Sequence, residues 1–293
     1  MPDSVVTAPA GVDEPQLKQL IMTIRDLPAM PHVASKVLEL SSDPDTSASL
    51  LQQVIADDQA MTARILKIAN SAMYACSRRI KTLSEAIVML GFNSIRSLVV
   101  TSAARNLYSS GGARMGLKER LLWEHSIGSA FACRLLIAER HPALMEEAFL
   151  AGLMHDIGKL VLNLQLPDRF EEIVQIVYNE SRDFDATERE LLGFDHAQVG
   201  ALLVNKWKLS PVLEEVIGLH HTRDQLGAGH PLLLYLDLAN QICHKCGIGF
   251  QERSDLALCE SDAGRAIGLS DAEVGTLTAQ LQHTLEVEME VFI

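Results

Sequence analysis

Apolar residues recur at intervals of three and four along nearly the whole 293-residue chain, whereas alternation of apolar and polar residues over the length of a strand is hard to find. Such spacing places the apolar side chains on one face of each helix. The sequence therefore predicts an all-α fold. Hydrophobic residues make up 48% of the chain, which is enough to fill a core between the helices.

Turn-forming residues divide this helical pattern into segments. Residues 1–16 are expected to be a flexible N-terminus, followed by an N-terminal helical bundle over 17–110 whose first helix is stopped by Pro28. The glycine-rich stretch SSGGARMG is the best candidate boundary before a second helical bundle over 117–250. Residues 251–293 are predicted to form an acidic C-terminal helical segment.

Composition limits where the protein acts and what it binds. The net charge of -13 argues against broad nucleic-acid binding, because contacts to phosphates need a basic face. The five cysteines form no paired framework, so we expect no disulfides and a cytoplasmic location. The apolar runs are short and interrupted by charges, so no membrane span is predicted.

Two local motifs have structural interpretations. In the segment CHKC, Cys243 and Cys246 continue the apolar helical stripe of Leu236 and Ala239, so we interpret them as core residues rather than metal ligands. The segment TLSEAIVMLGFNSIRSLVV predicts a helix, a turn at Gly91 and a second helix. This pair could be a DNA-binding helix-turn-helix, although the apolar residues of the second helix favour burial.

The stretch AGLMHDIGKLVL sets His155 and Asp156 inside an apolar run, which we interpret as part of a helix, MEEAFLAGLMHDI. Burying an imidazole and a carboxylate without partners costs several kcal/mol. Other segments must therefore supply partners. Helical spacing turns several further polar side chains toward the core, namely His125, His196, His220 and Asp237.

Two groups of these side chains have the composition of a metal site. The first group is His125, His155, Asp156 and Asp237. A second ion could be held by His196, His220 and His221, with Asp156 bridging. Mixed imidazole and carboxylate ligands suit iron, manganese or zinc rather than calcium, and we expect iron or manganese ahead of zinc.

The His, His-Asp and Asp pattern resembles the HD superfamily of metal-dependent phosphohydrolases, which implies a helical HD-type bundle around His125, His155, Asp156 and Asp237. The extra ligands of its HD-GYP branch, which cleaves cyclic di-GMP, would fall on His196, His220 and His221, and Lys159 matches the lysine of the HDIGK motif. The Gly-Tyr-Pro segment of that branch is absent.

The first half of the chain resembles a different branch. LPAMPHVASKVLEL, IADDQAMTARILKIANSAMY and TLSEAIVMLGFNSIRSLVV are similar to the N-terminal half of the HDOD domain, the HD-related output domain of bacterial signalling proteins. The resemblance covers about residues 20–245. It implies a role in signal transduction through binding to other signalling proteins, with a retained metal site.

Two alternatives remain open. As a metal-dependent phosphohydrolase acting on a phosphoester or cyclic dinucleotide, the chain would use metal-activated water at Asp156, and Lys159 would stabilise charge on the phosphoryl oxygens. Lys159 could equally be a surface lysine near a helix end. As a DNA-binding regulator, the chain would use the helix pair around Gly91.

Overall fold

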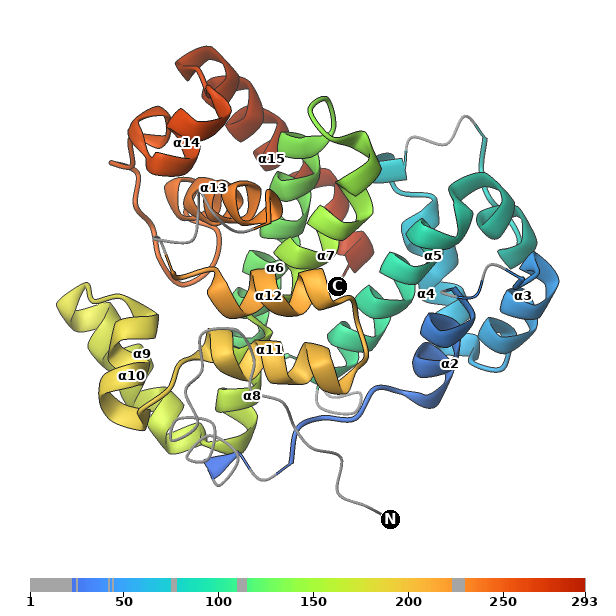
Figure 1. Cartoon of the computed structure of the whole chain (residues 1–293), viewed down its shortest axis with the longest axis horizontal. Coiled ribbons are helices and arrows are strands. Elements are labelled where there is room, and N and C mark those ends of the chain that lie inside the picture. Colours follow the sequence, from blue (N-terminus) through green and yellow to red (C-terminus); the bar gives the residue numbers. More distant parts are fainter. Residues whose placement is uncertain are drawn as a thin grey trace. The chain divides into compact units, whose positions relative to one another are not determined.

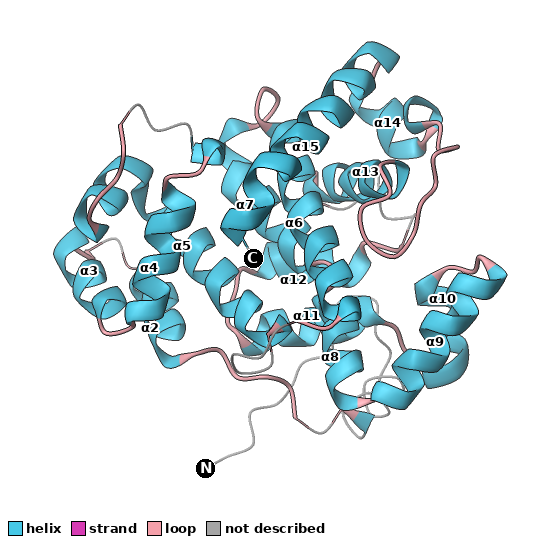
Figure 2. Ribbon diagram, turned by 180° about the vertical axis from the view of Figure 1, so that it is seen from behind, coloured by secondary structure: helices cyan, strands magenta, loops and turns pink. Residues whose placement is uncertain are grey.

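The computed structural model describes residues 23–24, 26–41, 43, 45–74, 78–109, 115–222 and 230–292. Throughout these residues the regular elements are helices, without a strand (Figure 2), which confirms the predicted all-α class. The chain divides into two compact units. Unit 1 comprises Met1–Pro28 and Met154–Leu234, and unit 2 comprises Ala29–Leu153 and Tyr235–Ile293.

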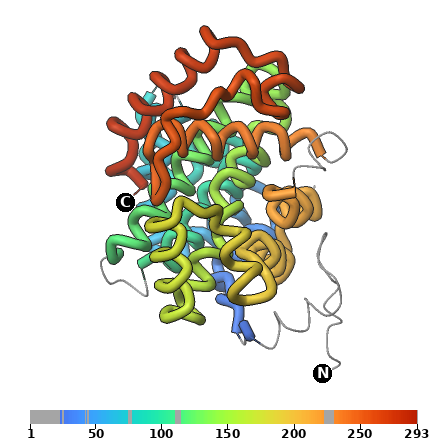
Figure 3. The backbone as a smooth tube through the Cα atoms, turned by 90° about the vertical axis from the view of Figure 1, so that its left-hand side faces the viewer, coloured from blue at the N-terminus to red at the C-terminus, as the bar shows by residue number. Residues whose placement is uncertain are grey.

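Unit 1 is built from consecutive short helices: α8 (Ile157–Gln165), α9 (Pro167–Glu180), α10 (Phe184–Leu192), α11 (His196–Lys206) and α12 (Pro211–Leu219). α11 packs against both α8 and α12, while α9 packs against α8 and α10. Figure 1 shows α11 and α12 side by side, and Figure 3 views both along their axes. The helix α11 is therefore the centre of this unit.

Short polar residues begin the two central helices of unit 1. Asp195 accepts a hydrogen bond from the backbone of Gln198, and the Gln198 side chain accepts one from the backbone of Asp195, so the start of α11 is fixed by a capping box. Ser210 caps α12, with Pro211 in the first turn. These caps fix where His196 enters α11.

Two glycines let α8 and α11 approach each other closely. A Cβ atom on Gly158 would lie 1.9 Å from the carbonyl oxygen of His196, and one on Gly200 would lie 3.5 Å from the side chain of Ile157 on α8. Only a residue without a Cβ fits the first of these positions. The glycine of HDIGK therefore has a packing reason, which is the contact between the two helices.

Unit 2 contains the remaining helices. They are α2 (His32–Ser41), α3 (Ala48–Ala56), α4 (Gln59–Ala69), α5 (Leu83–Tyr108), α6 (Leu117–Ile137), α7 (Met145–Met154, whose last residue belongs to unit 1), α13 (Leu232–Lys245, from Tyr235 onward), α14 (Asp262–Ile267) and α15 (Asp271–Phe292). Three 3-10 turns join them: η1 (Ala72–Tyr74), η2 (Pro142–Leu144) and η4 (Leu258–Glu260). α2, α3 and α4 gather around α5 (Figure 2), and α15 packs against α6.

Short polar side chains set the starts of two helices in unit 2. Ser47 caps α3 and Asp58 caps α4, each through its side-chain oxygen. The final helix begins directly after Ser270 and lies within the predicted C-terminal helical segment over 251–293. The helix predicted before Pro28 lies largely outside the described residues.

Gly91 interrupts α5 with φ 78° and ψ 169°, which confirms the predicted turn. Ile95, Leu98 and Val99, on the helix after the turn, have no exposed surface. They pack in the core and are not available to a DNA groove. An 18-residue window of α5 is long enough and, with a mean hydropathy of 1.4, apolar enough to cross a membrane, although no membrane span was predicted from the sequence. However, 61% of that window is buried in the protein.

The CHKC segment closes α13 as a core stripe. Leu236, Ala239 and Cys243 are buried, and Cys246 is half-buried. The four described cysteines are thiols rather than members of disulfides. Each unit also holds one tryptophan: Trp123 donates to the carbonyl of Phe292 in unit 2, and Trp207 donates to the carbonyl of Pro28 in unit 1.

Candidate metal centre

A break between two helices presents His155 and Asp156. α7 ends at Met154 and α8 begins at Ile157, so the prediction of one helix running through both residues was wrong. Asp156 has φ -95° and ψ 8°, which is outside the helical range. Both side chains are nonetheless buried, with exposed fractions of 0% for His155 and 2% for Asp156.

Nitrogen atoms surround the carboxylate of Asp156. Its Oδ2 lies 2.8 Å from Nζ of Lys159 and 3.6 Å from Nε2 of His155. Its Oδ1 lies 3.1 Å from Nε2 of His196 and 3.8 Å from Nε2 of His220. One oxygen thus faces an ammonium, and the other faces two imidazoles from α11 and from the end of α12.

Lys159 is buried, with only 8% of its surface exposed, so the interpretation of this residue as a surface lysine was wrong. Lys159 lies three residues after Asp156, on the first turn of α8, so its ammonium reaches back to the Asp156 carboxylate. The same ammonium lies 4.5 Å from the centre of the Phe184 ring, which adds a cation–π contact.

Glu188 orients His196. The Glu188 side chain is fully buried on α10, and its Oε2 lies 2.5 Å from Nδ1 and 2.8 Å from the backbone nitrogen of His196. Because an ionised carboxylate can only accept, Nδ1 carries a proton in this contact. The Nε2 atom of His196 is then the one that points to Asp156, as in metal sites where a carboxylate fixes the ligating histidine.

Three histidines and Asp156 form one cluster. One ligand atom from each of Asp156, His196, His220 and His221 lies within 4.8 Å of all the others. The Nε2 atoms of His196 and His221 are 2.8 Å apart. These four residues, called the His/Asp cluster below, all belong to unit 1.

His220 supplies the test of whether a cation fits this cluster. Its Nδ1 lies 2.7 Å from the carbonyl oxygen of Ile217, so Nδ1 carries the proton. In the neutral imidazole Nε2 then carries a lone pair, and this atom is buried without a hydrogen-bond partner in the described part of the chain. Because the nearest Asp156 oxygen also carries lone pairs, a cation is the group that would satisfy both atoms.

The electrostatics of the His/Asp cluster favour an ionised carboxylate and a neutral His221. Burial opposes the charge on Asp156, but His155 and Lys159 hold its pKa well below the usual value. Burial also opposes a charge on His196, but Glu188 and Asp156 raise its pKa to about 9. Burial and the neighbouring His220 and His196 lower the pKa of His221 well below 6.5. Without an ion, the cluster therefore combines the negative charge of Asp156 with a neutral His221 and with a His196 whose raised pKa favours the protonated form.

The other two predicted ligands, His125 and Asp237, belong to unit 2. There, Nδ1 of His125 lies 2.9 Å from the carbonyl oxygen of Ile248, and Nε2 lies 3.0 Å from the side chain of Asn240. Asp237 accepts a hydrogen bond from Gln241, one turn along α13. Their role in a first metal site with His155 and Asp156 stays a prediction.

Two residues of the centre were missed in the sequence. Glu188 lies four residues after the apolar Phe184 and four before Leu192, so it shares the inward face of α10, and this spacing could have indicated a buried acid. Gly158 was recognised only as part of a motif. Its close approach to His196 depends on the tertiary contact and left no local signal.

An all-helical fold with a buried His-Asp pair and further histidines around the same aspartate is the arrangement of the HD superfamily. The HDOD domain family matches residues 27–223, and the chain belongs to this family. A curated protein of Treponema pallidum (strain Nichols), described as uncharacterized, is 26% identical over 225 residues, which are 74% of this chain and 43% of that protein. The chain thus spans less than half of that relative.

Two solved structures agree in fold. The crystal structure of an HDOD domain protein of unknown function from Geobacter sulfurreducens is 25% identical, has a TM-score of 0.76, and the match covers 94% of this chain and 96% of that one. A candidate phosphohydrolase from Shewanella amazonensis SB2B is 27% identical with a TM-score of 0.73, and the match covers 94% of this chain and 97% of that one.

Proposed function

We propose that unit 1 binds a divalent metal ion through Asp156, His196, His220 and His221. This proposal rests mainly on the buried Nε2 of His220, which has no hydrogen-bond partner among the described residues and lies 3.8 Å from Oδ1 of Asp156. A cation between these atoms would satisfy both and would also take the Nε2 atoms of His196 and His221. Three imidazoles and one carboxylate suit iron or manganese, with zinc third.

The metal-holding domain serves a regulatory role in this proposal. Its support is the match to the HDOD family, together with the absence of the Gly-Tyr-Pro segment of the branch that cleaves cyclic di-GMP. We therefore infer that the chain acts in bacterial signal transduction by binding a signalling protein, with the ion stabilising unit 1. The reduced thiols of the four described cysteines favour the cytoplasm as its location.

A phosphohydrolase is the second candidate, and Lys159 favours it. A bound metal ion would polarise a phosphoryl oxygen and activate water. The buried ammonium of Lys159, held by Asp156 and Phe184, would stabilise negative charge on a phosphoester or cyclic dinucleotide. The Shewanella amazonensis structure described as a candidate phosphohydrolase supports this alternative.

Metal analysis of the purified chain tests the binding proposal. We expect about one equivalent of iron or manganese, and a loss of it in His220→Ala, which removes the bare nitrogen. The exposed His283 offers a matched control, because His283→Ala should keep the ion. The proposal would be refuted if the unsubstituted protein, expressed in metal-supplemented medium, contained no iron, manganese or zinc.

Hydrolysis assays separate the two roles. The metal-loaded chain and Lys159→Met are compared on a generic phosphodiester and on cyclic di-GMP. The regulatory proposal predicts equal background rates for both proteins, and co-purification of a partner that depends on bound metal. Turnover by the unsubstituted chain that falls in the variant would instead establish the phosphohydrolase.

A further inference from the structure

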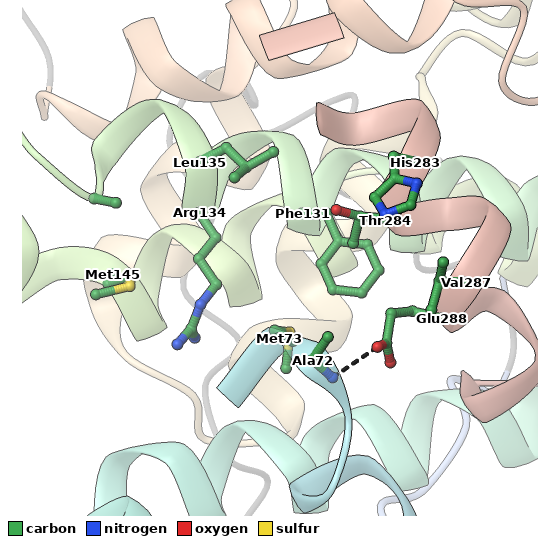
Figure 4. Close-up of a pocket in the computed structure, with 11 residues that line it drawn as sticks. Ala72, Met73, Phe131, Arg134, Leu135, Met145, His283, Thr284, Val287 and Glu288 are labelled. Carbon is green, nitrogen blue, oxygen red and sulfur yellow. Dashed lines mark hydrogen bonds between the residues drawn. The ribbon is translucent and has the colours of Figure 1, made fainter. Parts of the chain in front are cut away.

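Unit 2 contains a concave pocket that none of the functions above uses. Its walls come from η1, α6, the start of α7 and the second half of α15 (Figure 4), and its volume is about 310 Å³. Small-molecule sites usually range from about 300 to 1,000 Å³, so this pocket matches a small ligand. All of its lining residues belong to unit 2.

Most of the lining is apolar and adaptable. Phe131 lies at the centre of the lining, with Met73 below it and Met145 to its left in Figure 4. Val287 lies at the rim with 55% of its surface exposed, which is high for a large apolar residue. Methionine side chains adjust to irregular ligands, so the lining suits the short apolar body of a small molecule.

The charges around the pocket do not balance. The guanidinium of Arg134 lies 2.7 Å from Glu146 and 5.1 Å from the ring centre of Tyr74, so its positive charge is already compensated. Glu288, on the facing wall, has no basic partner among the ion pairs of the described residues. Besides the exposed His283, the pocket is thus lined by one compensated guanidinium and by one carboxylate that has no basic partner among the described residues.

Glu288 is also short of hydrogen bonds. Its side chain is buried, with 3% of the residue exposed, and Oε1 accepts one bond of 2.6 Å from the backbone nitrogen of Ala72 (Figure 4). Its second oxygen, Oε2, is buried and accepts none from the described residues. A carboxylate can accept about four hydrogen bonds, and burying an ionised one with a single donor is costly.

We propose that this pocket binds a small amphipathic organic cation, a primary ammonium with a short apolar chain. The ammonium donates to the Glu288 carboxylate, and the apolar chain packs against Phe131, Met73 and Met145. This arrangement supplies the donor and the positive charge that the pocket lacks, and it places apolar surface on apolar walls. Thr284, one turn before Glu288 on α15, adds a hydroxyl to the same wall.

Three six-carbon probes test the proposal: n-hexylamine, which is an ammonium at pH 7, hexan-1-ol and hexanoate. Binding is followed through the methyl resonances of 13C-methyl-labelled methionine, assigned with Met73→Leu and Met145→Leu. We expect hexylammonium to shift the Met73 and Met145 signals while leaving the core residue Met61 unchanged. Its affinity should exceed that of hexan-1-ol by about tenfold or more, as charge-assisted hydrogen bonds require.

Glu288→Gln is the decisive variant, because glutamine keeps the acceptor for Ala72 but removes the charge. We expect it to reduce hexylammonium affinity to that of hexan-1-ol with an unchanged unfolding transition. Glu286→Gln, an exposed position on the same helix, is the charge-matched control and should bind as the unsubstituted chain does. The proposal would be overturned by any of three results. These are equal affinity for hexylammonium and hexan-1-ol, tighter binding of hexanoate than of hexylammonium, and unchanged methyl signals of both Met73 and Met145.

Discussion

Each unit buries a carboxylate, and the two are stabilised by different means. Asp156 in unit 1 is 2% exposed and faces an ammonium and imidazoles. Glu288 in unit 2 is 3% exposed and is bonded to one backbone N–H. The first carboxylate is part of a set of mutually dependent charges, whereas the second can lose its charge without leaving a charged neighbour behind. We therefore expect the two carboxylates, although equally buried, to differ in their tolerance to substitution.

Removing the Asp156 side chain should have the largest effect. Asp156→Ala leaves the ammonium of Lys159 buried without its counter-ion, which typically costs about 3–5 kcal/mol. Denaturant unfolding would measure this loss, and metal analysis should find no bound ion. The exposed Asp168, replaced by alanine, is the control and should leave both quantities unchanged. If Asp156→Ala lowered the free energy of unfolding by less than about 1 kcal/mol, Asp156 and Glu288 would not differ in their tolerance to substitution.

The next largest effect is expected at Gly158. An added Cβ would meet the carbonyl oxygen of His196 at 1.9 Å, so Gly158→Ala must push α8 and α11 apart, which costs about 1–3 kcal/mol and separates Asp156 from His196. Gly275→Ala on α15 meets nothing within 4 Å and should stabilise by up to about 1 kcal/mol. Thermal unfolding of both variants checks this, and unchanged metal content in Gly158→Ala would contradict it.

Glu188→Gln should weaken the metal centre without unfolding the protein. The amide can still accept a hydrogen bond from His196, but the negative charge that makes His196 a more basic ligand is lost. Carboxylates that hydrogen-bond a ligating histidine in this way typically account for about 10–100-fold in metal affinity. Competition with a chelator would give the two affinities. Glu190→Gln changes the same charge at an exposed position two residues away and should bind metal normally. Identical affinities in the two variants would deny Glu188 its role.

For Glu288 the comparison predicts a small change in stability. Glu288→Gln keeps the bond to Ala72 and removes a buried charge, so the free energy of unfolding should stay within about 1 kcal/mol of the unsubstituted value. Asp156→Asn, which is the same chemical change in unit 1, should be clearly more destabilising. Similar losses in both variants would break the comparison.

The smallest effect is expected at Glu273, an exposed carboxylate in unit 2. The pH dependence of stability tests there how the partners of a carboxylate stabilise its charge. Hydrogen bonds from Ser270, helped by Arg140, lower the pKa of Glu273 from 4.5 to about 2. A lowered pKa contributes stability above the unfolded value, and this contribution is lost as the pH falls from 4.5 toward 2. Glu273→Gln should therefore differ from the unsubstituted chain in urea unfolding at pH 7 and differ less at pH 4. A constant difference would contradict the assignment.

The fold could be predicted wherever local chemistry decided it. Ser47 and Asp58 cap helices because their side chains reach backbone N–H groups three residues on, and Gly91 adopts a positive φ that other residues avoid. The helix break at His155 escaped prediction because apolar residues flank it on both sides. Periodicity alone does not distinguish one long helix from two helices joined by a buried turn.

The metal centre was predictable in composition but only partly in arrangement. Helical spacing turned His196 and His220 inward, and both are buried. The direction of Lys159 could not be read from the sequence, because the same position would suit a surface lysine. The contact between Glu188 and His196 joins two helices across a turn, so it follows from packing rather than from any local pattern.

The placement of the two tryptophans gives each unit its own optical reporter. Trp123 in unit 2 and Trp207 in unit 1 are both almost fully buried, and the chain has no third indole. Single Trp→Phe variants would therefore make the emission of one unit visible at a time. Fluorescence melting with and without metal could then tell whether an ion in unit 1 raises the melting temperature of that unit alone or of both together.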